Sequence, residues 1–411
     1  MSQPAQSDTR RWVVLAIVFI NLALLYGLWY SYSVFLVALL HEFHWSRSTI
    51  AGGFSVFVLV SGAISPVIGW LTGRLGAQRI ILLGAVTLGI GLCLAAQTSQ
   101  WWHLYLAFGG LASVGLTMAG WLPSIILVRG WFLDRVGTAV GIVSAGIGVG
   151  ITIIVPLTQY LVQQWGWRWA FRILALAIVV WVLPATRWLV RDAAPEAAAP
   201  PRGPGSYGRV GSWTVQKAIR DARYWQLAGV YFFGNMVTQL LFVHQVAFLV
   251  DHGVAPLAAA SVGGLAGFAS IVGKILWGSV SDRSGRVRTY GWALACLVAS
   301  LGVLVLSSDH PATVLPYAYA ILFGLGYAGT AVLIPAATSD LFAGPGFASI
   351  FGSLQAVLCL GAALGAWGAG KIFDVTGSYT FALWIAFVGS LASPTLMWLA
   401  GPSRPQRPAS V

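Results

Sequence analysis

The chain has 411 residues, of which 58% are hydrophobic and only 8% are charged. Soluble globular proteins carry about 25% charged residues, so this composition excludes an ordinary water-soluble fold and indicates a surface that faces hydrocarbon. The net charge of +12 could suggest nucleic-acid binding, but the basic residues lie between apolar runs and form no patch with aromatic residues. We therefore expect no nucleic-acid partner, and we attribute the charge to orientation in a lipid bilayer.

Twelve apolar runs follow one another along the chain, and each is long enough for a membrane span of about 20 residues. Inside a bilayer the backbone polar groups must be paired within the segment, so each run is expected to be an α-helix. The first run is too long for a signal-peptide core and predicts a permanent span. The runs cover residues 12–40, 47–72, 79–98, 102–129, 137–162, 169–190, 224–250, 257–281, 288–307, 312–339, 346–371 and 378–400.

The segment between the sixth and seventh runs differs from its neighbours. Residues 191–223 are rich in Pro, Ala, Gly and Arg, which is typical of a solvated linker, and 215–222 favour a short surface helix. The sequence therefore predicts an all-α membrane protein with 12 transmembrane helices in three parts. These are an N-terminal six-helix half (1–190), a cytoplasmic linker with a short surface helix (191–223) and a C-terminal six-helix half (224–411).

The distribution of Lys and Arg predicts the orientation of the chain. With a cytoplasmic N-terminus, 18 of the 23 basic residues fall on the inner side, 4 fall on the outer side, and Lys274 lies within a span. Because cytoplasmic loops carry an excess of Lys and Arg, we expect both termini in the cytoplasm. The short tails and the lack of a targeting peptide favour a multi-pass protein of the inner membrane of a bacterium.

The two halves share motifs at a constant spacing. The segments Gly69–Arg79 and Gly278–Arg288 follow the second and eighth runs and lie 209 residues apart. Gly141 and Gly150 in the fifth run correspond to Gly352 and Gly361 in the eleventh, 211 residues apart. Two motifs at nearly one offset indicate an internal repeat of six helices, a transporter plan that places the solute between the halves near the midplane.

The duplicated loop resembles the G-x-x-x-D-R-x-G-R signature of the major facilitator superfamily, and the resemblance covers the whole chain. The second copy is complete and supplies a charged loop motif expected to act in gating: Asp282, Arg283 and Arg286. The first copy keeps Arg74 and Arg79 but has Gly73 in place of the acid. A weaker charge clasp is therefore expected in the N-terminal half.

A narrower resemblance is to the monocarboxylate transporters and the related oxalate:formate antiporters, carried by three blocks: 278–286, 130–148 and 335–342. In the monocarboxylate family, span eight carries an acid and an arginine, which fall here on Ser270 and Lys274. The family's span-one lysine falls near Tyr30, and the antiporters' second lysine falls on Gln355. Only the cation at Lys274 is kept, which favours a monoanion over a dicarboxylate and weakens the usual proton-coupling scheme.

Ionisable residues inside membrane spans are costly and are functional by default. All eleven acids lie at termini, in loops or at span ends, whereas Lys274 lies deep in the eighth run. With no buried acid to pair with, Lys274 is predicted to bind an anionic solute; alternatively, helix carbonyls and cavity water satisfy it, or burial keeps it neutral. His244 is the only histidine well inside a span. Its usual titration range makes it a candidate for contact with the substrate or a proton, against a purely structural role.

Other polar or adaptable side chains in the spans could complete a pocket. Tyr hydroxyls can hold a carboxylate oxygen while the ring packs against a methyl group, although each candidate could equally be a packing residue. The further candidates for substrate binding are Tyr26, Tyr30, Met118, Ser270, Tyr327, Gln355 and Cys359.

These observations favour a monomeric secondary transporter that moves a small monocarboxylate, such as L-lactate or pyruvate, by alternating access. Proton-coupled symport is implied by the resemblance, with His244 and Lys274 as the coupling candidates. No enzymatic activity, cofactor or metal is expected. Three alternatives remain: organic-anion exchange without protons, export of an amphipathic drug past the 20 Trp and 20 Phe residues, and a membrane sensor.

Overall fold

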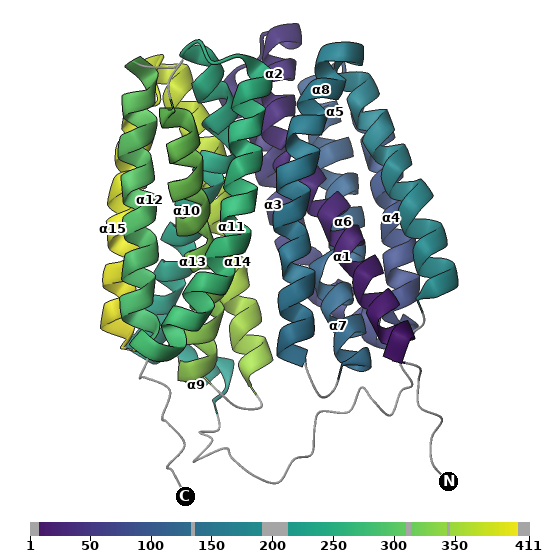
Figure 1. Cartoon of the computed structure of the whole chain (residues 1–411), viewed down its shortest axis with the longest axis vertical. Coiled ribbons are helices and arrows are strands. Elements are labelled where there is room, and N and C mark those ends of the chain that lie inside the picture. The colour runs from purple at the N-terminus through teal and green to yellow at the C-terminus, as the bar shows by residue number, and fades with distance from the viewer. Residues whose placement is uncertain (1–7, 133–135, 191–212, 310–313, 343–345, 402–411) are drawn as a thin grey trace, which may run out of the picture. The chain divides into compact units, whose positions relative to one another are not determined.

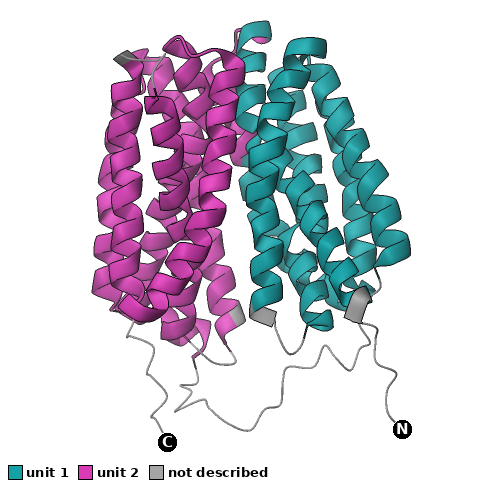
Figure 2. Ribbon diagram, in the orientation of Figure 1, with its two compact units in different colours: residues 1–42, 56–205 teal, residues 43–55, 206–411 magenta. Residues whose placement is uncertain are grey.

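The computed structural model describes residues 8–132, 136–190, 213–309, 314–342 and 346–401, and within these ranges every regular element is a helix. The chain forms two compact units (Figure 2): unit 1 holds residues 1–42 and 56–205, and unit 2 holds 43–55 and 206–411. The division is not a simple cut, because the first nine residues of one helix, α3, belong to unit 2 and the rest of that helix belongs to unit 1.

Unit 1 is built around the packing of α1 on α8, with α4 against α6 and α8 (Figure 1). Its elements are α1 (Asp8–Tyr30), α2 (Tyr32–Phe43), α3 (Arg47–Leu75), α4 (Ala77–Ala95), α5 (Trp101–Leu104), the π-helix η1 (Tyr105–Ala112), α6 (Ser113–Ala119), α7 (Trp121–Trp131), α8 (Val136–Pro184) and the π-helix η2 (Ala185–Leu189). The breaks within the first and fourth spans, at Ser31 and Gly120, interrupt single apolar stretches, Arg10–Phe43 and Trp101–Trp131.

Unit 2 is built around the corresponding packing of α10 on α14, with α11 and α12 against α13. Its elements are α9 (Val215–Ile219), α10 (Ala222–Asp251), α11 (Pro256–Ser284), α12 (Arg286–Asp309), α13 (Leu315–Leu341), α14 (Phe347–Thr376) and α15 (Thr380–Ala400). The short helix predicted at 215–222 ends earlier, at Ile219, because the Asp221 side chain accepts a hydrogen bond from the Arg223 N–H and caps the next helix.

Eleven helical stretches of the described chain are long and apolar enough to cross a membrane, and one of them holds two crossings. The stretch Thr138–Leu189 has 52 residues, far more than the about 20 that one span needs. It bends at Gly166, whose φ of 78° is outside the helical range. This bend lies between the fifth and sixth predicted runs, so the expectation of an all-α membrane fold with twelve spans is confirmed.

The internal repeat is visible in the packing of one helix pair inside each unit. A Cβ at Gly150 on α8 would collide with the carbonyl of Ala23 on α1, and a Cβ at Gly361 on α14 would collide with the carbonyl of Phe232 on α10. Ala23 and Phe232 lie 209 residues apart, the same spacing as the loop motifs. Small residues allow such close helix contact where lipid removes the hydrophobic drive for packing.

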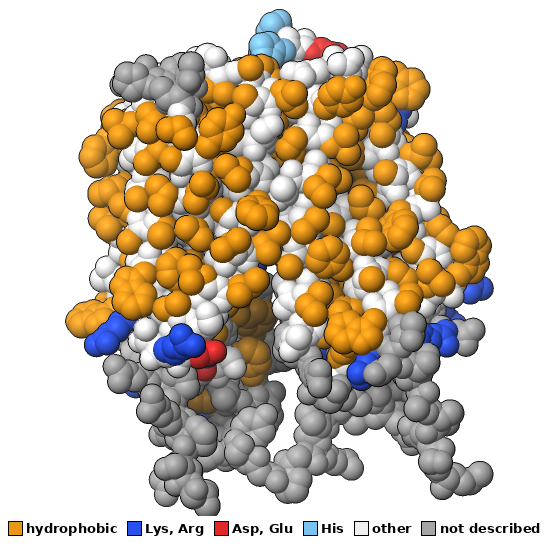
Figure 3. All heavy atoms as spheres, viewed as in Figure 1, with side chains coloured by type: hydrophobic (Ala, Val, Ile, Leu, Met, Phe, Trp, Pro, Cys, Tyr) orange, Lys and Arg blue, Asp and Glu red, His pale blue; other side chains and the backbone are white. Residues whose placement is uncertain are grey.

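The outward surfaces of the helices are apolar over most of their length (Figure 3). Large side chains such as Leu176, Trp188, Phe381 and Trp398 are all more than 60% exposed. In water, a surface of this kind would cause aggregation, whereas in a bilayer it is the expected lipid contact.

Candidate functional site

Lys274 projects from the middle of α11 in unit 2 and lies against an aromatic pair. Its Nζ is 5.7 Å from the ring centroid of Tyr327 on α13. Phe242 on α10 packs edge-on against the same tyrosine, with ring centroids 4.9 Å apart. An ammonium group within about 6 Å of a ring centroid is attracted to the face of the ring. Three helices of one unit thus contribute side chains around one cation. Two of these residues, Lys274 and Tyr327, are predicted site residues.

The acids whose side chains the structure describes are engaged away from Lys274, at helix ends. Glu42 accepts from Trp167 and Arg168, Asp251 pairs with Arg47, Asp282 and Asp340 pair with Arg286, and Asp221 caps α10. Asp374 accepts from the backbone N–H groups of Arg47 and Ser48. Among the described residues, Lys274 forms no ion pair with a carboxylate.

The remaining unit 2 candidates lie in less specific surroundings. The Ser270 hydroxyl is fully buried and donates to the Gly267 carbonyl of its own helix at 2.7 Å. Gln355 and Cys359 are half-buried, one turn apart on α14. Gln239 on α10 is only 6% exposed, and its Oε1 finds no hydrogen-bond partner within the described chain. An unpaired buried oxygen of this kind is costly, which makes Gln239 a further polar candidate.

The unit 1 candidates lie on two spans. Tyr26 stacks on Trp29 with ring centroids 6.0 Å apart, and the ring of Tyr30 is tilted against the same tryptophan with ring centroids 6.5 Å apart. Tyr30 is buried, whereas Tyr26 is half-buried. Met118 is half-buried on α6. Unit 1 therefore contributes aromatic and thioether groups, and its one predicted cationic position is a tyrosine.

His244 is 2% exposed, and both of its ring nitrogens are engaged within unit 2. Nδ1 lies 2.9 Å from the Tyr379 hydroxyl, and Nε2 lies 2.8 Å from the Ala366 carbonyl oxygen on α14. The hydrogen bonds of His244 therefore go to α14 and to the start of α15, rather than to Lys274. The two predicted coupling residues occupy different environments within one unit.

A charged cluster, which we call the Arg47 cluster, lies beside His244 and comprises Arg47, Asp251, Phe373, Asp374 and Tyr379. Arg47 donates to Asp251 at 2.7 Å and to the Tyr379 hydroxyl at 2.7 Å, and its guanidinium carbon lies 3.7 Å from the Phe373 ring centroid. Tyr379 is 5% exposed, and burial raises the pKa of its phenol above the usual range. The tyrosine is therefore a neutral hydroxyl that can both accept and donate.

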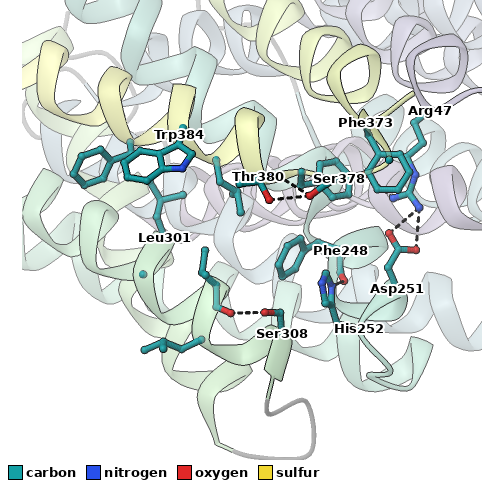
Figure 4. A pocket seen from close by; sticks show the side chains of 17 residues that line it. Arg47, Phe248, Asp251, His252, Leu301, Ser308, Phe373, Ser378, Thr380 and Trp384 are labelled. Carbon is teal, nitrogen blue, oxygen red and sulfur yellow. Dashed lines mark hydrogen bonds and ion pairs between the residues drawn. The ribbon is translucent and has the colours of Figure 1, made fainter. Parts of the chain in front are cut away.

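The Arg47 cluster opens onto a cavity of about 780 Å³ in unit 2 (Figure 4). Its polar end contains Arg47, Asp251, His252, Ser378 and Tyr379, and its apolar walls come from α12 and α15 and include Leu301, Val305, Leu383, Trp384 and Phe387. Arg47 and Asp251 face each other across one end in the close-up view. The cluster is thus accessible from outside the protein, whereas His244 is not.

The sequence is similar to that of known membrane transporters. The family model described as Major Facilitator Superfamily matches residues 18–366 and 227–410. The chain belongs to the major facilitator superfamily. Similar members include human monocarboxylate transporter 2, which is 25% identical over 90% of this chain and 81% of that protein. Bovine monocarboxylate transporter 13 is 27% identical over 91% of this chain and 85% of that protein. The uncharacterized MFS-type transporter YcxA of Bacillus subtilis is 24% identical over 93% of this chain and 94% of that protein.

The superfamily loop motif is organised as a clasp in unit 2. Arg286 lies 3.0 Å from Asp282 and 3.1 Å from Asp340 at the end of α13, and it also donates to the Ser281 hydroxyl at 2.6 Å. In unit 1, Arg74 stacks over Trp70 at 4.1 Å, and Arg79 is exposed. The second copy of the motif therefore ties α11, α12 and α13 together.

Sequence reasoning did not identify the Arg47 cluster. From the sequence, Asp251 and Asp374 belong only to the acids at span ends or in loops, and neither Arg47 nor Tyr379 is a predicted site residue. Their partners are more than 100 residues apart in several cases, and no spacing within one helix indicates the contact. The one available signal is a basic residue at the end of one span together with acids at the ends of two other spans.

Proposed function

We propose that this chain is a secondary transporter for a small monocarboxylate of the L-lactate or pyruvate class, working by alternating access with proton-coupled symport. The observation that carries the proposal is Lys274, a cation within a membrane-spanning helix beside Tyr327, with no carboxylate paired to it in the described chain. Two similar proteins are monocarboxylate transporters by name, which supports the same substrate class.

One fixed charge suits one carboxylate. The ammonium group of Lys274 would pair with the carboxylate of the solute, and the Tyr327 hydroxyl and ring would orient the small organic remainder. Charge-assisted hydrogen bonds contribute about 1.5–3 kcal/mol, which is enough to favour an anion over a neutral solute. The proposal places the protein in a bacterial cytoplasmic membrane as a monomer. The Lys and Arg distribution favours an orientation with both termini inside.

The test is uptake of radiolabelled L-lactate into liposomes that contain the purified protein, with and without an inward proton gradient. Accumulation driven by the gradient is the expected result. Uptake only into liposomes preloaded with another carboxylate would replace symport by exchange. Absence of uptake, together with failure of other monocarboxylates to bind, would overturn the monocarboxylate assignment and favour drug export.

The Lys274→Met variant tests the proposed role of the cation. Loss of one charge-assisted contact is expected to lower uptake at low substrate roughly 10- to 100-fold, because about 1.4 kcal/mol corresponds to a factor of ten. Lys371→Met is the matched control, since Lys371 is exposed near the end of α14 and its loss should leave uptake unchanged. Normal uptake by the folded Lys274→Met protein would contradict the anion-pairing role.

A further inference from the structure

A chain of hydrogen bonds runs from Arg47 to His244 in unit 2. The Nη1 atom of Arg47 donates to the Tyr379 hydroxyl oxygen at 2.7 Å. That hydroxyl lies 2.9 Å from Nδ1 of His244, and Nε2 of His244 lies 2.8 Å from the Ala366 carbonyl oxygen. Arg47 lies at the cavity and His244 is buried, so the chain connects an accessible charge to an inaccessible imidazole.

The end groups of this series of hydrogen bonds, the Arg47 guanidinium and the Ala366 carbonyl, determine which atom donates at each step. A guanidinium can only donate and a carbonyl can only accept. The Tyr379 oxygen therefore accepts from Arg47 and directs its own hydrogen to Nδ1 of His244, while Nε2 carries the hydrogen that Ala366 accepts. This arrangement is complete with a neutral His244 protonated at Nε2. A proton added at Nδ1 would meet the Tyr379 hydrogen, and the hydroxyl would have to accept twice and find a new acceptor.

The charges around His244 act in opposite directions, and Arg47 is the one that opposes its protonation. The groups that face it or its partner Tyr379 are Arg47 on α3, Asp251 and His252 at the end of α10, and Asp374 on α14. Arg47 opposes a second positive charge at His244. If Arg47 left, Asp251 and Asp374 would remain without their cation and would favour a protonated histidine. Tyr379 would then be free to accept from Nδ1.

We propose that Arg47, acting through Tyr379, controls proton binding at His244. His244 is neutral while Arg47 holds Tyr379, and it takes up a proton when Arg47 withdraws. Arg47 begins α3, whose residues 47–55 group with unit 2 while 56–75 group with unit 1. Movement of unit 1 would therefore pull on Arg47 along one continuous helix. The use of this proton in symport rests on the proposed function, whereas the control of His244 by Arg47 does not.

The experiment is NMR of protein labelled with ¹⁵N-histidine in lipid nanodiscs at about pH 6, near the usual titration range of histidine. The signal of His244 is assigned by its loss in the His244→Gln variant. The wild-type protein is expected to show the neutral Nε2–H tautomer. A protonated ring, or the Nδ1–H tautomer, would overturn the proposal without any variant at Arg47.

The Arg47→Gln variant mimics withdrawal of the arginine and is expected to raise the protonated fraction of His244 at least about tenfold, the usual scale for removal of a nearby like charge. The double variant Arg47→Gln/Tyr379→Phe separates the relay from a simple charge effect, because it lacks the hydroxyl that would accept from Nδ1. We expect a clearly smaller increase than in Arg47→Gln alone, because only the charge effect of Asp251 and Asp374 remains. An increase of the same size in the double variant would contradict control through Tyr379, and no increase in Arg47→Gln would contradict control by Arg47.

Tyr379→Phe alone covers the case in which variants of Arg47 do not fold. It should leave His244 neutral and move the Nδ1 signal to the position of a nitrogen without a hydrogen bond. An unchanged Nδ1 signal would show that Tyr379 is not its partner and would overturn the relay. None of these readouts uses substrate, so a failure of lactate uptake and a failure of this proposal are distinguishable.

Discussion

The loops at 69–79 and 278–288 have the same backbone turn and different chemistry. Gly76 and Gly285 occupy corresponding positions, and each has a φ of 87° at the junction of two helices. Around this shared turn, unit 2 has Asp282 and Arg286, whereas unit 1 has Gly73 and Ala77 at the equivalent places. The comparison shows that the turn is retained where the backbone demands it, while the charges are free to diverge.

The two loops are also anchored by different contacts. In unit 2 the Arg286 side chain bridges Asp282 and Asp340. In unit 1 the Gln78 side chain instead donates to the carbonyls of Thr186 and Val190, at 3.0 and 2.6 Å, and so fastens the loop to the end of the sixth span. A neutral amide therefore replaces an ion-pair clasp, and it does so by capping carbonyl groups that the ending helix leaves unpaired.

The largest expected effect tests the shared backbone. Gly285 has a ψ of 155° together with its positive φ, a region that is essentially restricted to glycine. Gly285→Val and Gly76→Val are each expected to lower the free energy of unfolding by about 1–3 kcal/mol. Thermal unfolding in detergent would measure this. A large loss in only one of the two variants would show that the turns are not equivalent.

A smaller effect is expected from the charges that distinguish the loops. Arg286→Ala removes contacts to two carboxylates and should destabilise the protein by about 1–2 kcal/mol, since Arg286 is only 16% exposed and hydrogen bonds to charged groups exceed ordinary ones. Unit 1 has Ala77 at the position of Arg286, so the comparison is Arg74→Ala, at a basic residue that the first loop keeps. This change removes only an exposed stacking contact and should cost at most about 0.5–1 kcal/mol. Equal losses in the two unfolding curves would contradict the difference between the copies.

How far the sequence predicts this molecule depends on the range of each interaction. The twelve spans were predictable because apolar runs are local, and the kink at Gly166 lies where two runs were separated. Lys274 was predictable as a candidate because its lack of a nearby acid is visible in the sequence. Its neighbour Phe242 was not, because that contact depends on how α10 packs against α13.

The surroundings of His244 show the limit most clearly. A solitary histidine in a span could be recognised, but one of its two partners is the backbone carbonyl of Ala366, 122 residues away. A backbone carbonyl has no side-chain signature. The other partner, Tyr379, also accepts a hydrogen bond from Arg47. In our proposal, the protonation state of His244 is set by Arg47, a third residue that acts through Tyr379.

The smallest expected effect comes from restoring the missing acid of the first loop. Gly73 is exposed at the end of α3, and a Cβ there would meet no atom within 4 Å, so Gly73→Asp introduces no clash. Replacing a helical glycine gains a few tenths of a kcal/mol, whereas an acid in the last turn of a helix opposes the helix dipole by a similar amount. The equivalent of Arg286 is Ala77, which is only 3% exposed and leaves no room for an arginine. The free energy of unfolding should therefore change by less than about 0.5 kcal/mol, and a larger gain would mean that Arg74 or Arg79 can supply the clasp that this loop otherwise lacks.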